Sequence, residues 1–84
     1  MYTILYRKSA EKELRKLDKD TLKRIVMKIQ KLTDNSRPDG VTKLSGSANL
    51  YRIRQGDYRI IYQIKDDALI VIVVKIGHRR DAYR

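Results

Sequence analysis

The chain has 84 residues, of which 20 are lysine or arginine and 10 are aspartate or glutamate, so its formal net charge is +10. It has no cysteine and one histidine, which excludes a disulfide framework, a thiolate zinc site and a multi-histidine metal site. No metal or other cofactor is expected. Hydrophobic residues make up 42%, enough for a modest core. We expect a small cytoplasmic domain whose partner is a polyanion.

Residues 1–84 are expected to form a single domain. Residues 1–42 carry 11 basic and 6 acidic side chains and residues 43–84 carry 9 and 4, whereas a detachable basic arm would make one half more basic. The longest apolar run, residues 68–74, is far shorter than the roughly 20 residues that span a bilayer. No signal peptide is apparent, and no membrane association is expected.

The first half of the chain is predicted to form a strand followed by a pair of helices. Residues 2–6 are β-branched and aromatic, which is typical of a strand. Ser9 is the expected N-cap of the first helix, and the break at residues 18–20 offers the next cap. Apolar side chains at helical spacing then predict the second helix: Leu22, Ile25, Val26, Ile29 and Leu32.

The second half is predicted to form most of a sheet. Residues 33–41 contain the only proline and indicate a loop. Residues 50–55 and 58–65 alternate in polarity around a turn signal, which predicts a β-hairpin. Residues 69–76 are apolar on both faces, as expected for a central strand covered on both sides. The order βααβββ indicates an α+β domain with the helical hairpin packed on a small, mostly antiparallel sheet.

The predicted hairpin gathers arginines on one of its faces. Ile53 must lie beside Ile60 or Tyr58 if the apolar residues are to share a face. Either register places three arginines on the opposite side, which we call the arginine face: Arg52, Arg54 and Arg59. Neighbouring like charges weaken a sheet slightly, and the planar guanidinium group suits phosphate. The arginine face is therefore a candidate phosphate-binding surface. The alternative is a solvated edge that discourages aggregation.

The last eight residues, 77–84, contain three arginines together with His78 and Tyr83. They form either a frayed terminus or a segment that lies over the arginine face and adds an imidazole and a phenol to it. No glycine-rich phosphate loop and no nucleophile elbow is present. The enzymatic chemistry that remains is metal-independent cleavage of RNA by its own 2′-hydroxyl, with arginines stabilising charge and His78 or Tyr83 moving protons.

Three motifs resemble the RelE/ParE superfamily of bacterial and archaeal toxins, on its RelE side. They are K-L-x-G from Lys43, Y-R-I-R-x-G-D-Y-R from Tyr51 and I-G-H-R-R-x-x-Y from Ile76. The resemblance covers essentially the whole chain and implies the RelE-like toxin fold. It also implies a type II toxin that enters the ribosomal A site and cleaves mRNA there, leaving a cyclic phosphate. A cognate RelB-like antitoxin would wrap this toxin and block its basic surface in a hetero-oligomeric complex.

The resemblance implies a role for individual positions. Arg59 and Arg79 would stabilise the phosphate in the transition state, while Arg52 and Arg54 hold the RNA backbone. Arginine stands at these last two positions where the best-known RelE pattern has lysine, and arginine does not readily give up its proton. His78 is a candidate for proton transfer, and Tyr83 would either stack on a base or take part in proton transfer. The remaining expected site residues are two further RNA-binding residues, Lys43 and Arg80.

Two other functions remain open at this point. ParE-like relatives share the fold but inhibit DNA gyrase instead of cutting RNA. A nucleic-acid-binding module that has lost its activity would also keep the basic surface. Cleavage of mRNA at translating ribosomes would distinguish a RelE-like nuclease from both of these functions. Inhibition of DNA supercoiling would distinguish the gyrase inhibitor from the binding module.

Overall fold

In residues 1–44, 46 and 49–78, which the computed structural model describes, the chain forms five strands and two α-helices. In chain order these are β1 (Thr3–Tyr6), α1 (Lys8–Arg15), α2 (Lys19–Gln30), β2 (Thr42–Lys43), β3 (Leu50–Gln55), β4 (Tyr58–Lys65) and β5 (Ile70–His78), with a 3-10 turn, η1 (Lys31–Thr33), directly after α2. The strands form one sheet in the order β1-β5-β4-β3-β2. β1 runs parallel to β5, and the other neighbours are antiparallel. Neither helix of this described part is long and apolar enough to cross a membrane.

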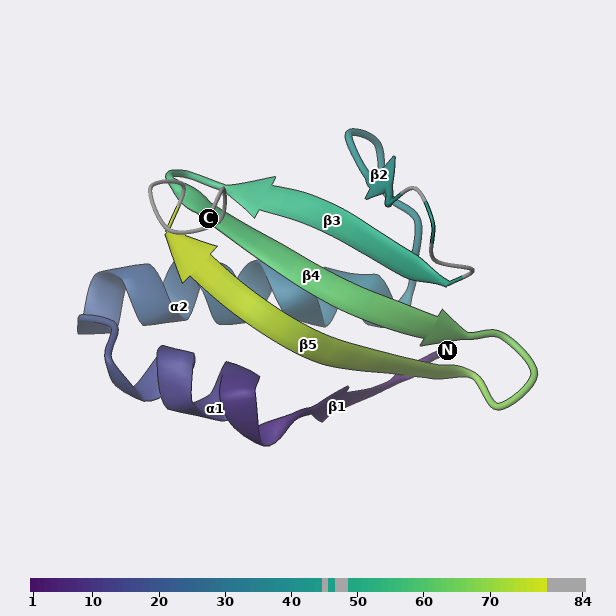
Figure 1. The fold of residues 1–84 in the computed structure, drawn as a ribbon, viewed down its shortest axis with the longest axis horizontal. Coiled ribbons are helices and arrows are strands. Elements are labelled where there is room, and N and C mark those ends of the chain that lie inside the picture. The colour runs from purple at the N-terminus through teal and green to yellow at the C-terminus, as the bar shows by residue number, and fades with distance from the viewer. Residues whose placement is uncertain (45, 47–48, 79–84) are drawn as a thin grey trace.

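Both helices pack against one side of the sheet, which we call the helix face (Figure 1). α1 lies against β5, and α2 lies against β3. The other side of the sheet, nearest the viewer in Figure 1, is called the open face. The buried core lies between the helices and the helix face and consists of Ala10, Ile25, Ile29, Leu32, Tyr51, Ile53, Ile60, Tyr62, Ile64, Val71, Val73 and Ile76. The α+β prediction with its helical hairpin is confirmed. The two-residue strand β2 was not predicted.

The register of the hairpin formed by β3 and β4 agrees with the alternation in the sequence. Ile53 pairs with Ile60, as predicted, and both are buried on the helix face. The turn between the strands consists of two residues, and Gly56 adopts a φ of +60° there, a conformation that glycine adopts without steric cost. Because side chains alternate along a strand, the polar partners of this hairpin face the other way, on the open face.

One helix begins as predicted and the other does not. The Asp18 side chain caps α2 by accepting a hydrogen bond from the Thr21 amide. Ser9 does not cap α1, which begins at Lys8. The Ser9 hydroxyl instead donates to the carbonyl of Val74 (2.8 Å), and the Arg7 amide donates to the carbonyl of Val73 (2.9 Å). The start of α1 is thus fastened to the middle of β5, because its hydroxyl finds a strand carbonyl in place of a helix amide.

β5 contains a β-bulge at this point. Ile61 pairs with Lys75 but Tyr62 pairs with Val73, so Val74 has no opposite residue on β4. A single extra residue reverses the alternation of every side chain that follows it. Val73 before the bulge and Ile76 after it are therefore both buried on the helix face, three positions apart.

The prediction that β5 is covered on both sides is wrong for the described residues. The two helices cover only the helix face. On the open face Ile70 and Ile72 are half-buried, and their neighbour Leu5 on β1 is 46% exposed. These apolar side chains shield one another on the sheet surface, which explains why β5 is apolar on both faces without a second layer of helices.

Candidate nucleic-acid interface

The arginine face lies at the end of the sheet where β3 turns into β4. Arg54 pairs directly with Arg59, and Arg52 pairs with Ile61 one step along the hairpin. All of these side chains share the open face, because each alternates with a residue buried on the helix face. The three guanidinium groups are therefore neighbours, as the sequence predicted. Arg54 is exposed, and its Nε donates to the carbonyl of Gly56 in the turn (3.1 Å).

A hollow of about 250 Å³ lies among these arginines. One wall comes from β2 and the loop before it, because Thr42 of β2 pairs with Arg52 of β3. The lining residues are Gly40, Thr42, Arg52, Ile53, Arg54 and Arg59. A hollow with three guanidinium groups on its walls concentrates positive potential, and it offers planar donors to a phosphodiester backbone.

A network at the opposite end of the hairpin holds this loop in place. The Arg37 guanidinium makes two hydrogen bonds to the Asp66 carboxylate (2.8 and 3.2 Å) and lies over the Tyr51 ring, 5.1 Å from its centroid. Tyr62, which is buried, donates its hydroxyl to the carbonyl of Ser36 (2.7 Å), and burial raises the pKa of Tyr62 to about 12. These contacts anchor residues 34–41 to the sheet, and they help to fix the position of Gly40 at the wall of the hollow.

The bulge at Val74 decides which residues of β5 join the arginine face. Lys75 pairs with Ile61, and Gly77 pairs with Arg59, so both lie on the open face beside the arginines. Lys75 is exposed. Sequence reasoning missed this fourth cation because regular alternation from Val73 would have turned Lys75 toward the helices. A strand that is apolar on both faces has no polar-apolar alternation, so its sequence does not reveal that a bulge reverses the sides on which the later residues lie.

The remaining predicted site residues do not all gather at this place. Lys43 pairs with Tyr51, so the register puts it on the side opposite to the arginine face. His78 follows Gly77 and also lies on the helix side, where its ring meets the edge of the Tyr58 ring at a centroid distance of 5.2 Å. The predictions for three other residues lie outside the described residues: Arg79, Arg80 and Tyr83.

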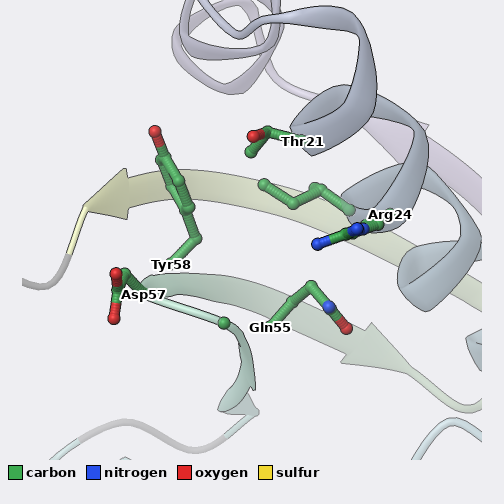
Figure 2. A pocket seen from close by; sticks show the side chains of 7 residues that line it. Thr21, Arg24, Gln55, Asp57 and Tyr58 are labelled. Carbon is green, nitrogen blue, oxygen red and sulfur yellow. The ribbon is translucent and has the colours of Figure 1, made fainter.

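A smaller pocket opens on the helix side of the same hairpin (Figure 2). Thr21 and Arg24 of α2 form one wall, and Gln55, Asp57 and Tyr58 of the hairpin form the other. Its volume is about 140 Å³, and its lining includes both a cation, Arg24, and an anion, Asp57. The sheet separates this pocket from the arginine face, which leaves the open face as the better candidate interface for an extended polyanion.

Comparisons with known proteins identify the family to which the chain belongs. The model of a family described as the ParE toxin of the type II toxin-antitoxin system, parDE, matches residues 4–83. The chain is also 36% identical over 80 residues to a RelE-like toxin protein of Escherichia coli, covering 93% of this chain and 83% of that protein. The chain belongs to the RelE/ParE superfamily of toxins. It is a RelE-like toxin of a toxin-antitoxin system.

Two further relatives place the chain on the RelE side of the superfamily. The mRNA interferase toxin RelE of Escherichia coli strain K12 is 30% identical over 80 residues, which cover 93% of this chain and 83% of that protein. The archaeal RelE–RelB complex from Pyrococcus horikoshii contains a chain that superposes with a TM-score of 0.84 at 29% identity, covering 95% of this chain and 97% of that one. The RelE-like toxin fold that the sequence motifs implied is confirmed.

Proposed function

We propose that this RelE-like toxin cleaves mRNA in the ribosomal A site and so stops translation in the cytoplasm. The observation that carries the proposal is the cluster of Arg52, Arg54 and Arg59 around one hollow of the open face. The similarity to a protein named mRNA interferase toxin RelE supports RNA as the substrate. A surface of this charge binds RNA through its phosphates, and the ribosome would hold the message in the orientation that cleavage needs.

The proposed reaction needs no metal ion. The ribose 2′-oxygen attacks the adjacent phosphorus, the bond from phosphorus to the 5′-oxygen breaks, and a 2′,3′-cyclic phosphate forms. One proton leaves the 2′-hydroxyl and one reaches the departing 5′-oxygen. Arg59 and Arg79 stabilise the charge that develops on the phosphate, and Arg52 and Arg54 hold the RNA backbone.

Proton transfer is assigned to His78 and Tyr83, and Lys43 and Arg80 are assigned to further contacts with RNA. His78 reaches the reaction from the end of β5, since its ring starts on the helix side against Tyr58. An imidazole exchanges protons near neutral pH, which arginine does not. RNA that engages both the arginine face and His78 therefore has to pass around the end of the sheet where β5 finishes.

The proposed protein partner is a RelB-like antitoxin encoded with the toxin. The Pyrococcus horikoshii structure is a RelE–RelB complex, which supports a hetero-oligomeric assembly here. Because the toxin has a net charge of +10, we expect an acidic, partly helical antitoxin segment to cover the arginine face. A complex whose interface avoided Arg52, Arg54 and Arg59 would count against this charge masking.

Primer extension on a reporter mRNA, with and without programmed ribosomes, tests the proposed activity. We expect cuts in register with the A-site codon, only when ribosomes are present, and at least a hundredfold less cutting by Arg59→Ala. Lys23→Ala, which removes an exposed cation from α2, is the matched control and should cut like the wild type. Full activity of Arg59→Ala at an unchanged melting temperature would overturn the site assignment.

Gyrase inhibition is the second candidate, because the family model that matches residues 4–83 is described as the ParE toxin. A folded protein that arrests growth, cuts no mRNA and blocks DNA supercoiling would establish this function. A protein that does neither but binds nucleic acid would be a binding module that has lost its activity.

A further inference from the structure

The pocket of Figure 2 lies on the helix side of the hairpin turn, and we call it the turn pocket. Its charge differs from that of the hollow on the arginine face, which is lined by three guanidinium groups. Among the described residues, the turn pocket is lined by one cation and one anion, Arg24 and Asp57. Opposite charges in one small pocket cancel most of the attraction for a phosphate. The turn pocket therefore suits an uncharged polar group.

The lining of the turn pocket combines an aromatic ring with groups that form hydrogen bonds. Tyr58, which is half-buried, supplies the ring, and the fully buried Ile25 lines the inner end. The Thr21 hydroxyl and the Gln55 amide can each donate and accept hydrogen bonds. Figure 2 shows the Tyr58 ring and the Arg24 guanidinium group on opposite sides of the pocket. An unstacked RNA base matches this lining, because it is a flat ring with donors and acceptors along its edge.

The Tyr58 ring is held in place from the neighbouring strand. Tyr58 pairs with His78 across β4 and β5, and the two rings meet at 84° with their centroids 5.2 Å apart. Edge-to-face contacts of this kind are favourable. Gln55 pairs with Tyr58 across the hairpin, so these two residues flank the turn at a fixed spacing. The wall on which a base would stack is therefore formed before binding, which lowers the entropic cost of binding.

The turn pocket lies where a bound message would leave the arginine face. The pair of Gln55 and Tyr58 is next to the pair of Arg54 and Arg59, one residue closer to the turn. Successive residues of a strand point to opposite faces, so the arginine pair lies on the open face and its neighbour lies on the helix face. RNA that passes around this end of the sheet, from the arginines toward His78, therefore also reaches Tyr58.

We propose that the turn pocket binds one unpaired base of the message while the arginine face holds the phosphates. The inference rests on the proposed function for the identity of RNA as the ligand. It adds a base subsite, in which Tyr58 stacks on the base and Arg24 donates hydrogen bonds to acceptors on the edge of the base. The pocket then contributes to the choice of codon, because the four bases differ in the donors and acceptors of their edges.

Two RNAs that cannot be cleaved separate base binding from phosphate binding. One is a 2′-O-methylated oligonucleotide that contains all four bases, and the other is a 2′-O-methylated chain of the same length without bases. Both carry the same phosphates, so the ratio of their binding constants measures what the bases contribute. Tyr58→Leu should lower this ratio at least fivefold, as expected for the loss of a stacking partner. Arg52→Gln should weaken binding of both RNAs alike and leave the ratio unchanged.

Arg24→Gln and Lys23→Gln form a matched pair, because both residues are exposed cations of α2 and only Arg24 lines the turn pocket. Arg24→Gln should lower the ratio at least twofold and change the relative cutting of different A-site codons. Lys23→Gln should change neither. Equal results for the two variants would overturn the proposal, even if Tyr58→Leu failed to fold. An unchanged ratio together with weaker antitoxin binding by Arg24→Gln would assign the pocket to a protein partner and would also overturn it.

The binding ratios keep this proposal distinct from the proposed function. A wild-type protein that binds both RNAs but cuts no mRNA would refute the proposed function, and the ratios would still decide whether the turn pocket holds a base. Normal cleavage by the wild type, with ratios that neither Tyr58→Leu nor Arg24→Gln changes, would refute the base subsite alone.

Discussion

Arg37 fastens the long loop before β2 to the turn after β4. Its guanidinium group faces the Asp66 carboxylate, which also accepts a hydrogen bond from the Tyr2 hydroxyl. The hydrogen bonds from Arg37 and then from Tyr2 lower the pKa of Asp66 to about 2, from an ordinary value of 3.8. One exposed carboxylate therefore joins the N-terminal strand, the loop and the β4–β5 turn.

The low pKa of Asp66 predicts a dependence of stability on pH. A carboxylate with a lowered pKa in the folded state stabilises the fold above its ordinary pKa, and this contribution disappears as the pH falls through the folded value. We expect Asp66→Asn to lower the melting temperature between pH 5 and 8. The difference from wild type should shrink as the pH is lowered from about 4 to about 2. Thermal melts across this range are the measurement, and a difference that persists at pH 2 would contradict the assignment.

At the scale of single elements, the start of α1 and the bulge of β5 depend on each other. The extra residue of a bulge leaves the strand ladder locally incomplete, and the carbonyl of Val74 is satisfied by the Ser9 hydroxyl. Ser9, in the first turn of α1 on the helix face, thus helps to hold the bulge that determines which side chains of β5 lie on the open face.

Ser9→Ala should therefore affect more than the helix that carries it. We expect a loss of about 1 kcal/mol in the free energy of unfolding, because one hydrogen bond disappears. Amide exchange around residues 73–78 should accelerate, and cleavage should fall severalfold because β5, which pairs with the strand that carries Arg59, is held less firmly. Asp18→Ala, which removes the cap of α2 at a similar cost of about 1 kcal/mol, is the control. It should leave exchange in β5 and cleavage unchanged, and identical behaviour of the two variants would refute the link.

The elements that sequence reasoning predicted well are those with a clear polar-apolar period. The alternation of residues 50–55 and 58–65 determined both the pairing of Ile53 with Ile60 and the common side of the three arginines. β5 had no such period, so neither its bulge nor the exposure of Lys75 could be predicted. Ser9 was misassigned because a hydroxyl near a helix start suits both a cap and a tertiary partner, and only the fold decides between them.

At the scale of the whole molecule, the sheet separates stability from recognition. The apolar core lies on the helix face, and the arginine face lies on the other side of the same strands. Adjacent residues of one strand therefore have different roles, since Ile60 packs in the core and Arg59 lines the hollow on the arginine face. The net charge of +10 is spread over both halves of the sequence, but the fold brings three of the cations together around one hollow at one end of the open face.

This distribution predicts which cations affect RNA binding. The logarithm of the binding constant for single-stranded RNA should fall linearly with the logarithm of salt concentration, with about 0.7 in the slope for each phosphate contact. Removing one contact by Arg52→Gln or Arg54→Gln should reduce the slope by about this amount. Lys23→Gln on α2 should leave it unchanged. Fluorescence anisotropy titrations at several salt concentrations measure the slopes, and equal reductions by all three variants would indicate binding by diffuse charge.

The bulge in β5 also has a genetic consequence. Loss of codon 74 in frame would remove only the residue without an opposite partner, and Val73 and Lys75 would then alternate as neighbours. Lys75, Ile76, Gly77 and His78 would keep their sides. Loss of codon 53 in β3, which has no bulge, would instead turn Arg54 toward the helices. Among cells that survive expression of this toxin, deletions of codon 53 should therefore outnumber deletions of codon 74.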